Sequence, residues 1–142
     1  MTQFRKIEDG YFIGPQPTEQ DLQEAKQQRI KTVIDFRMPS ETETPNDVLV
    51  KNNGLNYANV PVNKASPSAE QIDALDKALQ QNEGPFLLHC ATGARAAMLL
   101  ALSRAKQQGW SAERTFDDAK SMGYDLKGSP VFLAFVTQQT QK

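Results

Sequence analysis

The stretch that decides the fold of this chain runs from Phe86 to Ala105 and reads FLLHCATGARAAMLLALSRA. Its first four residues, mostly apolar, are typical of a short strand, and a loop of small residues around one glycine follows them. The loop leads into a run of Ala, Leu and Met, which are strong helix formers. A strand, a tight loop and a helix N-terminus together collect backbone N–H groups around an anion. The stretch therefore predicts an oxyanion-binding loop.

The chain's only cysteine and only histidine, Cys90 and His89, stand side by side where this loop begins. The positive end of the following helix and the guanidinium of Arg95 both favour a thiolate at Cys90 over a thiol. A lone cysteine is most often a buried core residue, so the prediction rests on the combination of residues. We predict a thiolate nucleophile at the floor of an anion cradle. The predicted anion-binding residues are Ala91, Thr92, Gly93, Ala94 and Arg95.

Composition narrows the class of protein. A length of 142 residues predicts a single domain, residues 1–142, with one sizeable core. Sixteen basic against 17 acidic residues argue against nucleic acid or an anionic membrane as a partner. One cysteine permits no internal disulfide, and no Cys/His cluster suggests a metal, so we expect no metal and no cofactor.

The first residues lack the apolar core of a signal peptide, and no apolar run approaches the ~20 residues of a membrane span. These two features predict a cytoplasmic protein, although a leader removed earlier would leave no trace in the sequence.

Segments typical of strands alternate with segments typical of helices along the chain. Apolar or β-branched runs predict strands over residues 11–13, 32–36, 57–62 and 86–89. Capping residues and helical spacing predict helices over 18–28, 45–54, 68–82, 94–108 and 112–122, and a last one from 129 onward. In the second helix, Val48, Leu49 and Asn52 are the expected inner face.

This alternation predicts an α/β fold: a central, largely parallel sheet of about four to five strands with helices on both faces. Ligands of such sheets bind beyond the carboxyl ends of the strands. Arg37, Asn63 and the Cys90 loop each follow a predicted strand, so we expect all three at one edge of the sheet.

The segment from His89 to Arg95 resembles the signature of the cysteine-dependent protein phosphatases. Residues 11–17 with the following helix, and then residues 32–37, resemble the opening of dual-specificity phosphatases, and residues 57–62 resemble their next strand. The chain is most similar to the bacterial beta-lactamase-hydrolase-like, phosphatase-like family, which has a similarly short loop and an ending like GYDL at 123–126. The resemblance covers roughly residues 7 to 128.

The resemblance implies a dual-specificity-phosphatase-like fold and hydrolysis of phosphate monoesters through a phosphocysteine intermediate. Cys90 and Arg95 would be catalytic, and the substrate would be a phosphorylated protein or a small phosphate ester. Phosphate, sulfate and vanadate would bind as ligands. In these phosphatases the arginine that corresponds to Arg37 is largely a structural bridge, and the alternative role for Arg37 is a second basic contact to substrate. The residues expected to support the site are His89, Asp35, Arg37 and Asn63.

Two features of the segment from Cys90 to Ala96 depart from the phosphatase pattern. Four residues separate Cys90 from Arg95, where typical tyrosine phosphatases have five. Four is the spacing of rhodanese-type sulfurtransferases, which carry a persulfide on the cysteine. Ala96 stands where phosphatases have a Ser or Thr whose hydroxyl stabilises the thiolate, and Thr92 is a possible substitute.

The general acid is also missing from its expected place. Asn63 and Lys64 occupy the loop where these phosphatases have an aspartate, and an Asn side chain has no titrating proton to give. Two alternatives therefore stay open: sulfur transfer through a Cys90 persulfide, and a phosphate-binding module with little or no turnover. The carboxylates that could replace the missing acid are Asp35, Glu41, Glu43 and Asp125.

Overall fold

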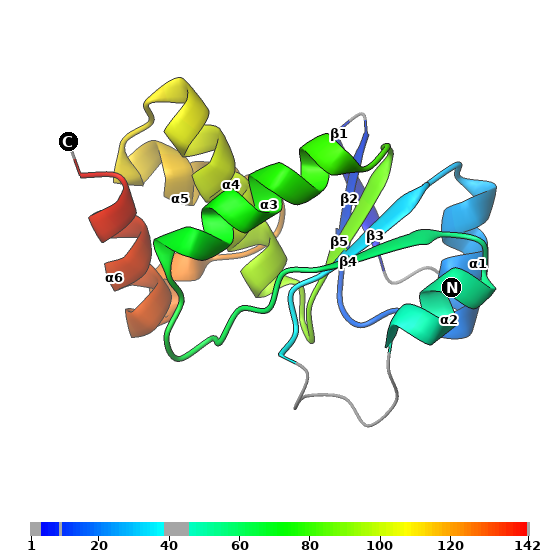
Figure 1. Cartoon of the computed structure of the whole chain (residues 1–142). Coiled ribbons are helices and arrows are strands. Elements are labelled where there is room, and N and C mark those ends of the chain that lie inside the picture. The colour runs from blue at the N-terminus through cyan, green and yellow to red at the C-terminus, as the bar shows by residue number, and fades with distance from the viewer. Residues whose placement is uncertain (1–3, 9, 39–45, 142) are drawn as a thin grey trace.

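A computed structural model describes residues 4–8, 10–38 and 46–141. Its strands form one sheet in the order β1-β2-β5-β3-β4 (Figure 1). β2, β5, β3 and β4 run parallel, and β1 pairs antiparallel with β2. The expectation of an α/β fold around a largely parallel sheet is confirmed. The strands are β1 (Arg5–Glu8), β2 (Tyr11–Gly14), β3 (Thr32–Asp35), β4 (Asn56–Asn59) and β5 (Phe86–His89).

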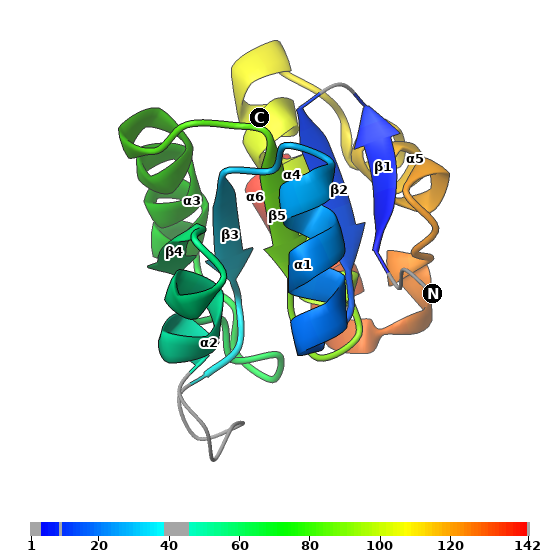
Figure 2. The ribbon, with the colours of Figure 1, turned by 90° about the vertical axis from the view of Figure 1, so that its right-hand side faces the viewer.

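Helices cover both faces of the sheet, as predicted. α1 and α2 lie on one side of the sheet and the other helices lie on the opposite side, where α6 packs against α4 and α5 (Figures 1 and 2). None of the helices in the described ranges is both long enough and apolar enough to cross a membrane. The helices are α1 (Glu19–Gln27), α2 (Asn46–Asn52), α3 (Ala69–Gln81), α4 (Ala94–Gln108), α5 (Ala112–Ser121) and α6 (Pro130–Gln139), with a 3₁₀ turn, η2 (Leu126–Gly128), before α6.

The opening stretch forms the centre of the molecule. All four residues of β5 are buried between β2 and β3, which accounts for its nearly continuous apolar sequence. α4 begins directly after Gly93 and buries side chains on nearly all sides, from Arg95 to Ala105. The register sets the last residue of β5, His89, beside Gly14 of β2 and Asp35 of β3. The parallel strands thus end together at the edge where Cys90 follows.

The polar edges of the sheet differ from the sequence prediction. β1 was not predicted, because its residues are mostly charged and exposed, and it is held only as an edge strand against β2. β4 is shorter than the predicted 57–62. The N–H groups of Val60 and Val62 still donate to the carbonyls of Asp35 and Phe36, at the end of β3 and just after it, but Pro61 between them has no N–H to donate.

The predicted inner face of α2 was wrong in two of its three residues. Val48 is 52% exposed and Asn52 is exposed, whereas Val50 is completely buried. Leu49 is partly buried and packs against the same core as Val50. The helix is only seven residues long, so a small rotation about its axis exchanges the face it buries. The predicted start of this helix at Pro45 lies outside the described residues.

Candidate functional site

Hydrogen bonds join the chain segments that follow three parallel strands. The Phe36 N–H donates to the His89 carbonyl at 2.8 Å, and the Val62 N–H donates to the Phe36 carbonyl at 3.0 Å. Arg95 then donates from Nη1 to the Val62 carbonyl at 2.9 Å. The segments after β3, β4 and β5 therefore meet at one edge, where the strand order places them.

The loop from Cys90 to Arg95 folds tightly around the cysteine sulfur. The Gly93 N–H donates to Cys90 Sγ at 3.0 Å, and the Ala94 N–H donates to Thr92 Oγ1 at 3.3 Å. Gly93 has a φ of 102°, in the left-handed region where glycine is unstrained. Gly93 thus directs a backbone donor at the sulfur, whereas Ala96 has no side-chain hydroxyl to do so.

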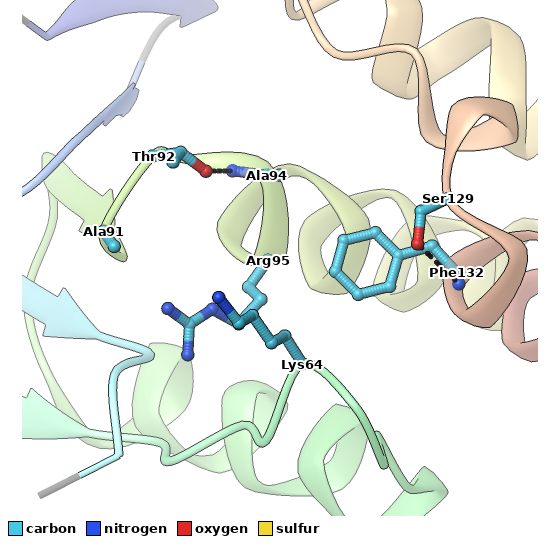
Figure 3. A pocket seen from close by; sticks show the side chains of 7 residues that line it. All are labelled: Lys64, Ala91, Thr92, Ala94, Arg95, Ser129 and Phe132. Atoms are coloured by element: carbon cyan, nitrogen blue, oxygen red, sulfur yellow. Dashed lines mark hydrogen bonds between the residues drawn. The ribbon is translucent and has the colours of Figure 1, made fainter. Parts of the chain in front are cut away.

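A pocket of about 240 Å³ opens beside this loop (Figure 3). Among the described residues that line it, two are basic and none has a carboxylate, and Lys64 crosses the side chain of Arg95 in the view of Figure 3. Cys90 itself is 0% exposed beneath the loop. The wall therefore suits an anion, and the thiol is shielded from bulk water. The lining residues are Lys64, Ala91, Thr92, Ala94, Arg95, Ser129 and Phe132.

A buried ion pair lies behind the loop. Asp35 accepts hydrogen bonds from the Arg37 backbone N–H at 2.9 Å, from its Nε at 3.0 Å and from its Nη2 at 3.1 Å. The Tyr57 hydroxyl donates to the same carboxylate at 2.9 Å. Burial alone would raise the pKa of Asp35, but the hydrogen bonds from Arg37 and the nearby charges of His89 and Arg37 bring it below its usual value. Asp35 is thus an ionised carboxylate that is held by Arg37.

A family model described as "Beta-lactamase hydrolase-like protein, phosphatase-like domain" matches residues 3–107. The chain belongs to this family. A beta-lactamase hydrolase-like protein of Xylella fastidiosa (strain Temecula1 / ATCC 700964) is 27% identical over 141 residues, which are 96% of this chain but 33% of that protein. The chain thus spans 33% of the length of this curated relative.

Solved structures share the fold of this phosphatase-like domain. A candidate phosphatase from Neisseria meningitidis Z2491 has a TM-score of 0.80 and 24% identity, with 98% of this chain and 99% of that one covered. A cysteine-to-serine variant of P. aeruginosa TpbA, in complex with phosphotyrosine, has a TM-score of 0.75 and 18% identity, with 94% and 82% covered. Identities this low establish the fold alone, which is that of the tyrosine and dual-specificity phosphatases.

The residues proposed to replace the general acid have other partners where the structure describes them. Asp35 is paired with Arg37, and Asp125 caps η2 by accepting the Lys127 N–H at 3.2 Å. Neither lines the pocket. Glu41 and Glu43 lie outside the described residues. The phosphatase-like domain therefore has, within the described ranges, no carboxylate on the wall of its pocket.

Asn63, which we expected to support the site, closes a turn beside the pocket. Its Oδ1 accepts the Ala65 N–H at 2.9 Å, and the next residue, Lys64, lines the pocket. Ser129 and Phe132 reach the same pocket from the start of α6. Sequence reasoning missed these two residues because only the tertiary fold brings α6 beside the loop. In the sequence, Ser129-Pro130 predicts where a helix begins, but it does not indicate that this helix packs beside the Cys90 loop.

Below Cys90, the phosphatase-like domain contains a neutral histidine. Burial lowers the pKa of His89 to about 4, although the Asp35 carboxylate, with Oδ1 at 3.9 Å from His89 Nδ1, favours the charged form. The unfolded chain has a histidine of ordinary pKa, about 6.5. Between these two values the unfolded state binds a proton that the folded state does not.

We therefore expect acid to destabilise the fold through His89. The contribution of His89 to the free energy of unfolding falls by about 3 kcal/mol as pH is lowered from 6.5 to 4, because the unfolded chain binds the proton more tightly throughout this window. Urea titrations at a series of pH values measure this slope. His89→Leu removes the titrating group. In this variant the free energy of unfolding should change less with pH in the same window, by up to the amount that one bound proton contributes. Equal slopes for the two proteins would show that His89 does not contribute.

Proposed function

We propose that this domain hydrolyses phosphate monoesters with Cys90 as the nucleophile. The observation that carries the proposal is the Gly93 N–H directed at Cys90 Sγ at 3.0 Å, in a loop that enters the N-terminus of α4. The helix dipole and this hydrogen bond both favour a thiolate. Beside it, the pocket presents Arg95 and Lys64, whose charges suit the phosphate group.

The reaction follows from these positions. The Cys90 thiolate attacks phosphorus in line, the S–P bond forms, and the P–O bond to the leaving group breaks with its electron pair on oxygen. Water then attacks phosphorus, which releases phosphate and regenerates the thiolate. The Arg95 guanidinium now bonds to a neutral carbonyl, that of Val62. A phosphate is a stronger, charge-assisted acceptor, so we expect substrate to draw Arg95 toward the pocket and open the way to Sγ.

The substrate is a phosphorylated protein or a small phosphate ester, and inorganic phosphate, sulfate and vanadate are ligands of the same loop. The basic pocket supports an anionic group of this kind. The TpbA variant, which shares the fold, binds phosphotyrosine.

The leaving group is expected to decide the rate. With no carboxylate on the described pocket wall, the ester oxygen leaves without a proton from the protein. General acids contribute about 10²–10⁴-fold, so an aryl ester such as para-nitrophenyl phosphate should exceed an alkyl phosphate in kcat/KM by at least about 100-fold. Steady-state kinetics with the two esters checks this ratio. Similar rates would indicate an acid beyond the described residues, such as Glu41 or Glu43.

Sulfur transfer is the second candidate function, and the spacing of four residues between Cys90 and Arg95 favours it. The thiolate would attack the outer sulfur of thiosulfate, the S–S bond would break, and sulfite would leave with the electron pair. A thiophilic acceptor such as cyanide would then take sulfur from the persulfide. Neither step needs a general acid from the protein, which agrees with the lack of a carboxylate among the described residues of the pocket wall. Thiosulfate:cyanide turnover without phosphatase activity would favour this function, and tight phosphate binding without either turnover would favour a binding module.

A further inference from the structure

The peptide unit between Thr92 and Gly93 is hydrogen-bonded at both of its ends. The Tyr124 hydroxyl donates to the Thr92 carbonyl at 3.1 Å, and the Gly93 N–H donates to Cys90 Sγ at 3.0 Å. A trans peptide is planar, and its C=O and N–H point in opposite directions. A group that fixes the carbonyl therefore also aims the N–H. We propose that Tyr124 is a positioning residue that stabilises the Cys90 thiolate through this peptide.

Tyr124 is held in place by the way α5 ends. The Gly123 N–H donates to the Lys120 carbonyl at 2.9 Å, and the Tyr124 N–H donates to the Ala119 carbonyl at 3.0 Å. With Gly123 at a φ of 106°, these two bonds form a Schellman motif. The Tyr124 ring is half-buried and packs against the main core. The end of α5 thus fixes the backbone position from which the Tyr124 side chain reaches the loop.

The hydroxyl is suited to act as a donor. Burial raises the pKa of Tyr124, and the negative charge of Cys90 raises it further, so the hydroxyl keeps its proton at neutral pH. Donation to a carbonyl polarises the peptide and strengthens its N–H as a donor to the thiolate. Gly93 permits the approach, because a Cβ at this position would overlap the Tyr124 hydroxyl.

Other charged or titratable groups also surround the thiol and the hydroxyl. His89 precedes the thiol on β5 and is neutral above about pH 4, and Arg95 and Lys64 lie at the pocket. The charge of Arg5 on β1 opposes part of the rise in the pKa of Tyr124 that burial and Cys90 cause. Tyr124→Phe changes none of these groups and keeps the ring, so it isolates the hydroxyl.

The test is a pH titration of the thiolate. Cys90 is the only cysteine, so the ultraviolet absorbance of its thiolate can be followed directly after subtraction of the matching Cys90→Ser protein at each pH. We expect Tyr124→Phe to move the midpoint upward by about 0.5 to 1 pH unit, the effect of one hydrogen bond. The matched control is Tyr11→Phe on β2, whose ring stacks on Phe86 away from the loop, and it should not move the midpoint.

This inference builds on the proposed role of Cys90 as a nucleophile, but its readout does not require turnover. Below the midpoint, kcat/KM for para-nitrophenyl phosphate should fall about 3- to 10-fold in Tyr124→Phe. A midpoint equal to that of the wild type would overturn the inference, and so would a lower melting temperature with no shift of the midpoint. A shifted midpoint in a protein with no phosphatase activity would support the role of Tyr124 and reject the proposed function.

Discussion

Replacement of Cys90 by serine is expected to lower the turnover of para-nitrophenyl phosphate at least about a thousandfold while phosphate and vanadate still bind. A serine hydroxyl ionises far less readily than a thiol, so one hydrogen bond from Gly93 and one helix dipole cannot make it an effective nucleophile. The proposed anion ligands, by contrast, are backbone N–H groups and Arg95, which the substitution leaves in place. Steady-state kinetics and calorimetric titration with phosphate measure the two properties separately.

Arg95→Lys is the variant to compare with Cys90→Ser. A lysine cannot make the two parallel hydrogen bonds of a guanidinium, so this variant should lose anion affinity as well as turnover. Different losses in the two variants would separate the nucleophile from the anion ligand. Phosphatase activity that survives in pure Cys90→Ser protein would reject the phosphocysteine mechanism.

The sequence could predict those parts of the site that are contiguous in the chain. β5, the Cys90 loop and α4 were predicted correctly, because apolar strand residues, one glycine and a run of helix formers determine their structure locally. Tyr124 could not be connected to Thr92 in this way, since 32 residues separate them and only the end of α5 brings them together. The same reason accounts for Phe132 in the pocket wall.

Edge elements were the weak point of the sequence prediction. β1 has no apolar pattern to detect, and α2 buries Val50 rather than Val48. In both cases the sequence carries little hydrophobic periodicity, so tertiary packing decides the outcome. The family resemblance was more informative about Arg37. It implied a structural bridge, and Arg37 is paired with Asp35 and 2% exposed.

The largest loss of stability that we expect comes from breaking the buried ion pair between Asp35 and Arg37. Asp35→Asn should lower the free energy of unfolding by about 3–5 kcal/mol, because it leaves the Arg37 guanidinium buried without its counter-charge. The asparagine retains one oxygen for the Tyr57 hydroxyl, so the loss comes mainly from the charge. Urea denaturation near pH 7, where Asp35 is ionised, measures the change.

Two further variants distinguish a broken ion pair from general damage to the core. The double variant Asp35→Asn with Arg37→Met removes both charges and should recover most of the lost stability, since an apolar replacement of a buried pair is often neutral. The exposed pair of Lys31 and Glu83, at 3.3 Å with side chains 56% and 79% exposed, is the matched control. Glu83→Gln should cost less than about 1 kcal/mol, because water screens that pair. If the double variant is as unstable as Asp35→Asn alone, the loss does not come from an uncompensated charge, and the network beneath Cys90 is held together by packing and hydrogen bonds instead.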